Sequence, residues 1–175
     1  EATAGVAFYM PISFLMIGLT MGLGSGVTAS VARFIGQNEK SNADSSAKHA
    51  MVIAGIISFI FTLSGFFFGK TVLTFLGAFG IVHLLAWDYL SVIVFGFPFM
   101  VFSGFFRSIL AGEGDMKLPM IVAGLGTAFN IILDPIFIFK FEKLGNFGLG
   151  LGVKGAALAT VISQFIVFII FIYKL

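Results

Sequence analysis

The chain has 175 residues, of which 59% are hydrophobic and only 10% are charged. Soluble domains carry about 25% charged residues, so this chain could not cover a water-facing surface and belongs in a lipid bilayer. The formal net charge of +2 is small and the basic residues are scattered, which argues against a nucleic-acid partner. The absence of cysteine excludes disulfides and thiol chemistry.

Five apolar segments are long enough to cross a bilayer, which needs roughly 20 helical residues. They lie at about 3–34, 49–69, 89–110, 119–139 and 155–173. Residues 71–87 are also uncharged, but the stretch Gly69–Lys70 is too short for the reversal that a further span would need. An interfacial helix is therefore predicted there. The predicted fold class is all-α: a polytopic transmembrane helix bundle of five spans plus an interfacial helix.

Small residues recur at four-residue spacing in three of the predicted spans. The three stripes are Gly18–Gly22–Gly26–Ser30, Gly104–Ser108–Gly112 and Gly155–Ala159–Ser163. Small side chains let helix backbones approach closely in lipid, where hydrophobicity does not drive helices together. Each stripe is therefore predicted to be a packing seam.

The fourth span contains one carboxylate in otherwise uncharged surroundings, because residues 118–139 carry no other charge. Asp134, Asn130 and Thr127 share one face of the predicted helix. Pro135 has no N–H to donate to the carbonyl four residues earlier. An ionisable group inside an apolar span marks an ion or substrate pathway, and these oxygens together suit a small cation. The alternative is a helix-end carboxylate near the outer surface, since Asp before Pro commonly ends a helix.

Other motifs do not support an enzyme or a cofactor site. The segment 65–71 resembles a P-loop but has three residues between its glycines where four are needed. His49 and His83 are isolated and lack the spacing of metal ligands. No nucleophile–base pair stands out. The chain is therefore predicted not to be an enzyme and to need no cofactor.

Four stretches in order resemble the multidrug and toxic compound extrusion (MATE) family of cation-coupled antiporters. They are residues 22–37, 112–119, 130–138 and 152–160. The resemblance implies a twelve-helix, two-lobe transporter in the plasma membrane, of which this chain is a partial N-terminal lobe with spans two to six. The first span and the C-terminal lobe of the same transporter would then be missing partners.

The resemblance also implies roles for particular residues. Asp134 and Asn130 match cation ligands of the family's fifth span, where Na⁺ is a candidate metal ion, and Thr160 matches a hydroxyl of the same network. Thr127 joins this set because it lies on the same helical face. Family members export amphipathic organic or drug-like compounds, driven by inward flow of Na⁺ or H⁺. A small organic substrate and membrane lipid are therefore the expected partners.

Arg107 departs from the family pattern, which commonly has Asn at this place. If the reversal between the third and fourth spans is centred near Leu118, Arg107 and Asn130 would both lie ~17 Å from it. This placement leads to the hypothesis of an internal ion pair, in which Arg107 donates to Asn130 or Asp134 and competes with the transported cation. The alternative is an arginine that snorkels to the cytoplasmic headgroups.

Two other functions remain open at this point. A lipid-linked oligosaccharide flippase has the same broad architecture but should have a more basic cavity, for which Arg107 is the only buried candidate. A non-transporting membrane assembly module could pack through the small-residue stripes. Such an inert bundle would gain nothing from the polar face of Asp134, Asn130 and Thr127, since a carboxylate in lipid is costly.

Overall fold

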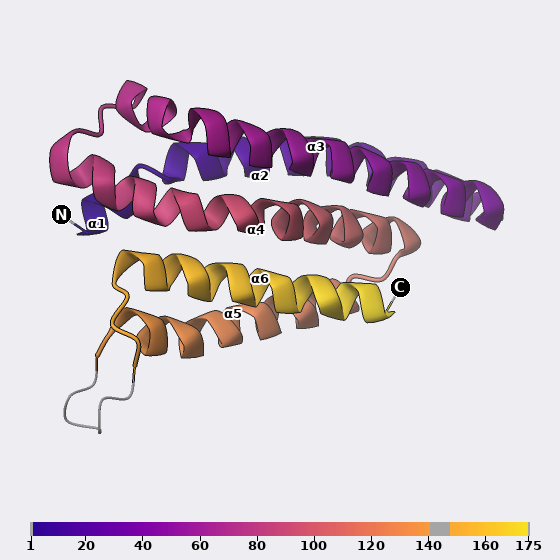
Figure 1. Cartoon of the computed structure of the whole chain (residues 1–175). Coiled ribbons are helices and arrows are strands. Elements are labelled where there is room, and N and C mark those ends of the chain that lie inside the picture. The colour runs from indigo at the N-terminus through magenta and orange to yellow at the C-terminus, as the bar shows by residue number, and fades with distance from the viewer. Residues whose placement is uncertain (1, 141–147, 175) are drawn as a thin grey trace.

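The computed structural model describes residues 2–140 and 148–174, and these residues are mostly helical. The helices are α1 (Ala2–Ala7), α2 (Met10–Gly36), α3 (Lys40–Phe75), α4 (Gly80–Glu113), α5 (Lys117–Ile138) and α6 (Val153–Lys174). They form a bundle of roughly parallel and antiparallel rods (Figure 1). In the described part of the chain, five helical segments are long and apolar enough to cross a membrane. The chain is therefore a multi-pass integral membrane protein.

Helix α4 is the centre of the bundle. It packs against α1, α2 and α3 on one side and against α6 on the other, whereas α5 joins the bundle mainly through α6 (Figure 1). Phe97, Phe105 and Ile93 of α4 are each at most 1% exposed. Because α4 supplies so much of the core, its side chains are well placed to connect sites on the surrounding helices.

Residues 71–87 do not form the predicted interfacial helix. Helix α3 continues to Phe75, and α4 follows after a short turn in which Gly77 has a φ of 94°, a conformation that glycine adopts without steric cost. Lys70 does not end the third helix, because its ammonium lies 5.1 Å from the centre of the Trp87 ring on α4. This cation–π contact lets a charged residue remain within a long apolar helix.

The first apolar segment forms one span at Thr3–Gly36, as predicted, but its helix has a short break. Helix α1 ends at Ala7, and α2 begins at Met10 with Pro11 in its first turn. Proline has no N–H to continue the hydrogen-bond ladder from the preceding turn, so the helix is interrupted. At the interruption, the ring of Tyr9 packs against Tyr89 of α4 with their centroids 5.2 Å apart.

The turn between α4 and α5 comes earlier than Leu118. Gly114 ends α4 with a φ of 88°, and the Asp115 carboxylate then accepts hydrogen bonds from the N–H groups of Lys117 and Leu118 at 2.9 and 3.0 Å. These bonds satisfy N–H groups that the first turn of a helix leaves unpaired. The reversal is therefore centred near residue 115 and not near residue 118.

Two of the three small-residue stripes are packing seams. A Cβ atom on Gly112 would meet Val31 of α2 at 2.8 Å, and one on Gly155 would overlap the backbone carbonyl of Phe137. By contrast, the glycines of the stripe on α2 have open space around them. The prediction is confirmed for the stripes on α4 and α6, and it is wrong for the α2 stripe within the described residues.

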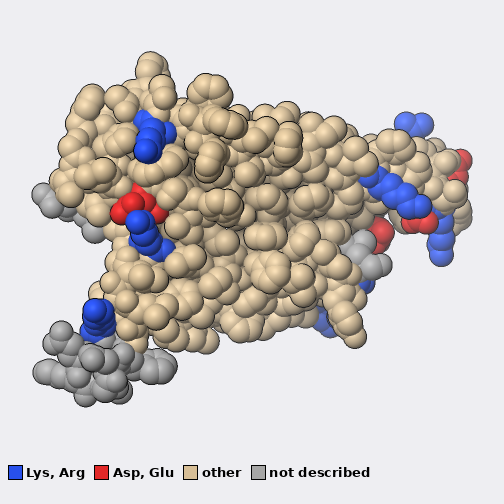
Figure 2. Space-filling view, in the orientation of Figure 1, with Lys and Arg blue, Asp and Glu red and all other residues tan. Residues whose placement is uncertain are grey.

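Charged side chains gather at the two ends of the bundle, and the visible face between them is uncharged (Figure 2). At one of these ends, Lys154 of α6 forms an ion pair with Asp88 of α4 at 3.1 Å. An uncharged belt between two charged ends is the surface that a bilayer requires.

Candidate functional site

A cavity of about 240 Å³ lies between α4, α5 and α6. Helices α4 and α5 have little contact with each other, but both pack against α6. The cavity therefore lies between α4 and α5, on the side of α6 that both of them contact. The lining residues are Arg107, Ala123, Gly126, Thr127, Asn130, Thr160, Ser163, Gln164 and Val167. We call this space the polar cavity. It brings together four of the five predicted site residues, from three different helices.

The two threonines of the polar cavity have the same local arrangement. Thr127 donates its hydroxyl hydrogen to the carbonyl of Ala123, and Thr160 donates to the carbonyl of Ala156, both at 3.0 Å. A hydroxyl has one donor and two acceptor lone pairs. Because each donor is used within its own helix, both oxygens keep acceptor capacity for a cation or for a donor group.

Unpaired polar atoms are concentrated at this site. In the described part of the chain, five buried side-chain nitrogen or oxygen atoms lack a hydrogen-bond partner. Three of them belong to Asn130 (Nδ2), Asp134 (Oδ1) and Ser163 (Oγ). A buried polar group without a partner costs about 1–3 kcal/mol, and most such groups in folded proteins are paired. These atoms therefore point to a partner that comes from outside the described residues.

Asp134 lies next to the polar cavity but does not line it. It is one helical turn beyond Asn130, within the final turns of α5, which ends at Ile138. Its backbone position is thus close to the helix end, as the alternative reading of the sequence proposed. The Oδ1 atom is nevertheless buried, although the residue as a whole is partly exposed.

Tyr89 of α4 connects the carboxylate to the polar cavity. Its phenol lies close enough to Thr160 and to Asp134 for an electrostatic interaction with each of them. The sequence analysis missed Tyr89, which stands at the border between a predicted span and the predicted interfacial helix. Its signal is a tyrosine at the start of an apolar run, since a buried phenol needs a hydrogen-bond partner.

Two more polar residues of the cavity were not predicted as site residues. Ser163 was considered only as part of a small-residue stripe, and Gln164 was not considered. Both follow Thr160 on α6 at spacings of three and four residues, which places the three side chains on one helical face. This spacing was the available signal.

Arg107 lines the polar cavity, but it forms no ion pair with Asp134 and no hydrogen bond with Asn130 among the described residues. The reason is axial depth. Arg107 is ~9 Å before the end of α4, whereas Asn130 is ~20 Å beyond the start of α5, because the turn lies near residue 115. The expectation of equal depth was wrong, and the predicted direct pair is absent.

The direction of the Arg107 side chain explains how it still reaches the cavity. Arg107 lies in the last two turns of α4, and side chains on a helix lean toward its N-terminus, which is consistent with Arg107 lining the cavity. Arg107 is an exposed residue, so the alternative of an arginine that snorkels to the headgroups stays a prediction.

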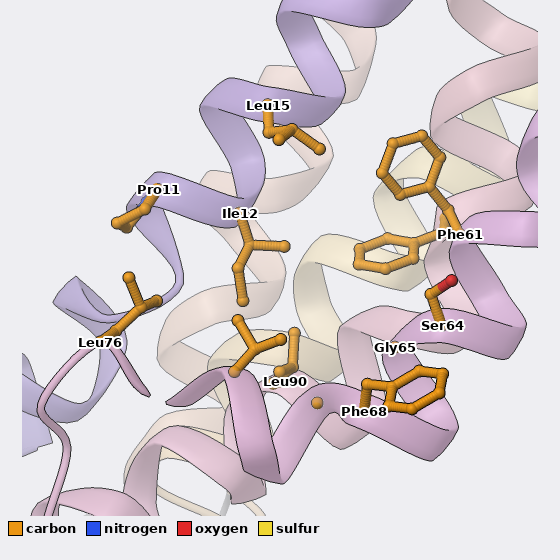
Figure 3. A pocket seen from close by; sticks show the side chains of 12 residues that line it. Pro11, Ile12, Leu15, Phe61, Ser64, Gly65, Phe68, Leu76 and Leu90 are labelled. Carbon is orange, nitrogen blue, oxygen red and sulfur yellow. The ribbon is translucent and has the colours of Figure 1, made fainter. Parts of the chain in front are cut away.

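A second cavity, of about 320 Å³, lies between α2, α3 and α4. Figure 3 shows Ile12 and Leu15 of α2 on one side of it and Phe61 and Phe68 of α3 on the other. We call it the apolar cavity, because Ser64 is the only one of its described lining residues with a polar side chain. None of the predicted site residues lines it, so it is not the candidate site.

The motifs that the sequence analysis set aside have structural roles. Residues 65–71 lie inside α3, which is not the strand–turn–helix setting of a P-loop. Ring nitrogens of His49 and His83 lie 2.7 and 3.2 Å from the backbone carbonyls of Ser45 and Lys70.

Comparisons with known proteins agree with this architecture. The family model described as MatE matches residues 1–136. The chain is 28% identical over 172 residues to the probable multidrug resistance protein YoeA of Bacillus subtilis (strain 168), covering 97% of this chain and 36% of that protein. It is 30% identical over 167 residues to the probable multidrug resistance protein NorM of Thermotoga maritima, covering 95% of this chain and 35% of that protein.

A crystal structure of a MATE protein in the bent conformation superposes on the whole chain with a TM-score of 0.93 and 34% sequence identity, and 37% of that protein is covered. The chain thus spans about a third of the length of the proteins that it matches. The rest of each relative has no counterpart in these 175 residues.

Proposed function

The chain belongs to the MatE family, and on that premise we propose that it is part of a cation-coupled antiporter that exports amphipathic organic compounds. It would supply spans two to six of the N-terminal lobe, and the remainder of the transporter would supply the first span and the second lobe. The observation that carries the proposal is the buried Oδ1 atom of Asp134, which has no hydrogen-bond partner among the described residues.

The coupling ion, Na⁺ or H⁺, binds at Asp134 in this proposal. The carboxylate oxygen, the Asn130 amide oxygen and the Thr160 hydroxyl oxygen are the hard ligands that such a cation prefers. Pro135 adds to this set, because it leaves the carbonyl of residue 131 without its helical hydrogen bond. The cation neutralises the carboxylate and removes the cost of a bare charge in lipid.

Neutralisation of Asp134 drives export by changing the balance between two conformations. A ligand shifts such a balance only by its difference in affinity for the two states. Binding of the cation therefore favours the outward-releasing conformation, and its loss toward the inside restores the cavity. Tyr89 couples α4 to this event, because its phenol lies close to both Thr160 of α6 and Asp134 of α5. The role is transport in the plasma membrane and not catalysis.

The test is Asp134→Asn in the full-length transporter, with efflux of an organic cation measured in membrane vesicles under an imposed Na⁺ or H⁺ gradient. We expect gradient-driven efflux to be lost while the amount of protein in the membrane stays near normal. Asp44→Asn is the matched control, because it makes the same change at an exposed carboxylate of α3. Unchanged efflux in Asp134→Asn would refute the proposed role.

A further inference from the structure

Arg107 places a permanent positive charge at the polar cavity. The guanidinium stays protonated at every relevant pH. Among the described residues Arg107 has no salt-bridge partner, and the cavity lining contains no Asp or Glu. The carboxylates close to it in sequence, Glu113 and Asp115, lie beyond the end of the cavity, and Asp115 is engaged by the first N–H groups of α5.

The other polar groups of the cavity are neutral. Gln164 and Asn130 each carry an amide, and Ser163 carries a hydroxyl. Asn130 and Ser163 include buried atoms with unmade hydrogen bonds. None of these groups can neutralise Arg107. The described lining of the cavity therefore carries a net charge of +1 and has amide and hydroxyl donors around it.

A positive charge within the span of a membrane protein is costly unless a counter-charge approaches it. The planar guanidinium is suited to one kind of partner in particular, because its parallel N–H groups match the two oxygens of a carboxylate or phosphate. The neutral side chains around it can supply further hydrogen bonds to such oxygens. The missing partner should thus be an anionic oxygen group.

We propose that the polar cavity binds the anionic group of an organic substrate and that Arg107 is the residue that selects it. This inference rests on the proposed transport function and names a substrate class for it: amphipathic compounds that carry a carboxylate or a similar anion, including zwitterions. It is compatible with cation coupling, because Asp134 lies outside the cavity lining and is not paired with Arg107. The negative and positive groups of the site thus serve two different ligands.

The experiment uses two dyes that differ only at one group. Tetramethylrhodamine has a free carboxylate, and in its methyl ester that charge is removed. Dissociation constants are measured by fluorescence polarisation with the purified full-length transporter in uncharged detergent. The wild-type protein should bind the free carboxylate about tenfold more tightly than the ester, the effect of one charge-assisted hydrogen-bonded contact. In Arg107→Asn the ratio should fall to about one.

Two variants separate charge from geometry and from general effects. Arg107→Lys should keep a part of the preference, because lysine keeps the charge but lacks the planar fork. Arg33→Asn makes the same change at a second exposed arginine, on α2, that does not line the cavity, and it should keep the wild-type ratio. Binding of the ester by Arg107→Asn shows that the variant is folded.

Two results would overturn the inference. The first is that the wild-type protein and Arg107→Asn each bind the two dyes with equal affinity. The second is an unchanged ratio together with a lower unfolding temperature of Arg107→Asn, which would mean that a carboxylate elsewhere in the transporter neutralises the arginine. Gradient-driven efflux of the cationic ester is scored separately. Its absence in the wild-type protein would refute the antiporter function while leaving the binding ratio as the measure of the Arg107 role.

Discussion

The polar cavity and the apolar cavity are similar in size, about 240 and 320 Å³, but they present opposite chemistry. The apolar cavity is walled by aliphatic and aromatic side chains of α2, α3 and α4 (Figure 3). The polar cavity lies on the other side of α4 and is lined by an arginine, two amides and three hydroxyls. The central helix α4 thus separates an apolar cavity from a polar one.

The difference shows what each space requires in a membrane. Lipid tails have the same chemistry as most of the wall of the apolar cavity, so that space loses packing contacts but leaves no buried polar side-chain atom of its described lining unpaired. The polar cavity and the neighbouring Asp134 hold three buried atoms without hydrogen-bond partners, and lipid cannot supply these bonds. The stability of the apolar cavity therefore depends on packing, whereas that of the polar cavity depends on a polar partner outside the described residues.

The largest effect should come from truncating the wall of the apolar cavity. Phe97→Ala removes a side chain that is 1% exposed and that meets Phe61 edge to face at 6.3 Å. We expect the free energy of unfolding, measured for the full-length transporter by SDS titration in mixed micelles, to fall by about 3–5 kcal/mol. Phe95→Ala is the control on the same helix, because Phe95 is 64% exposed. Equal losses in the two variants would contradict a packing role for this wall.

A smaller loss should follow from adding one methyl group to the polar cavity. In Gly126→Ala the new Cβ would overlap a methyl group of Val167 on α6, whereas Gly124→Ala meets open space on the same helix. Overpacking should lower the free energy of unfolding of Gly126→Ala by about 1–3 kcal/mol. Gly124→Ala should be neutral or more stable by up to about 1 kcal/mol, because alanine favours the helix. If Gly126→Ala proved as stable as its control, α5 and α6 could not be closely packed here.

The smallest effect should have the opposite sign. Ser163→Ala removes a buried hydroxyl without a partner, so the free energy of unfolding should rise by about 1 kcal/mol. Ser64→Ala makes the same change at an exposed serine beside the apolar cavity and should stay within about 0.5 kcal/mol of the wild type. A destabilised Ser163→Ala would mean that the hydroxyl has a partner in the complete transporter, and the contrast between the two cavities would weaken.

Much of the fold could be predicted from the sequence. The five apolar helices were expected at the places where they lie, since the length and composition of each segment govern its transfer into lipid. The errors were at boundaries. Lys70 was expected to end a helix, but its contact with Trp87 keeps it within a longer one. The stripe of small residues on α2 was expected to pack, but a stripe alone does not say which helix will cover it.

The candidate site could be predicted only in part. Asn130 and Thr127 share a helical face by their spacing, and Thr160 was expected from the resemblance to a known family; all three line one cavity. Tyr89 and Gln164 were missed because their importance depends on contacts with other helices.

The sequence by itself determined that this protein lives in a membrane, that its helices cross it and that one of them carries a carboxylate beside a proline. These properties are local, because partition into lipid and helix periodicity depend on neighbouring residues of the chain. Only the tertiary structure decided which other residues lie beside each polar group. A turn centred near residue 115 sets the position of α4 along α5, and this position separates Arg107 from Asp134. Arg107 lines the polar cavity instead. Such a register is decided by the packing of side chains between helices, which no single segment contains.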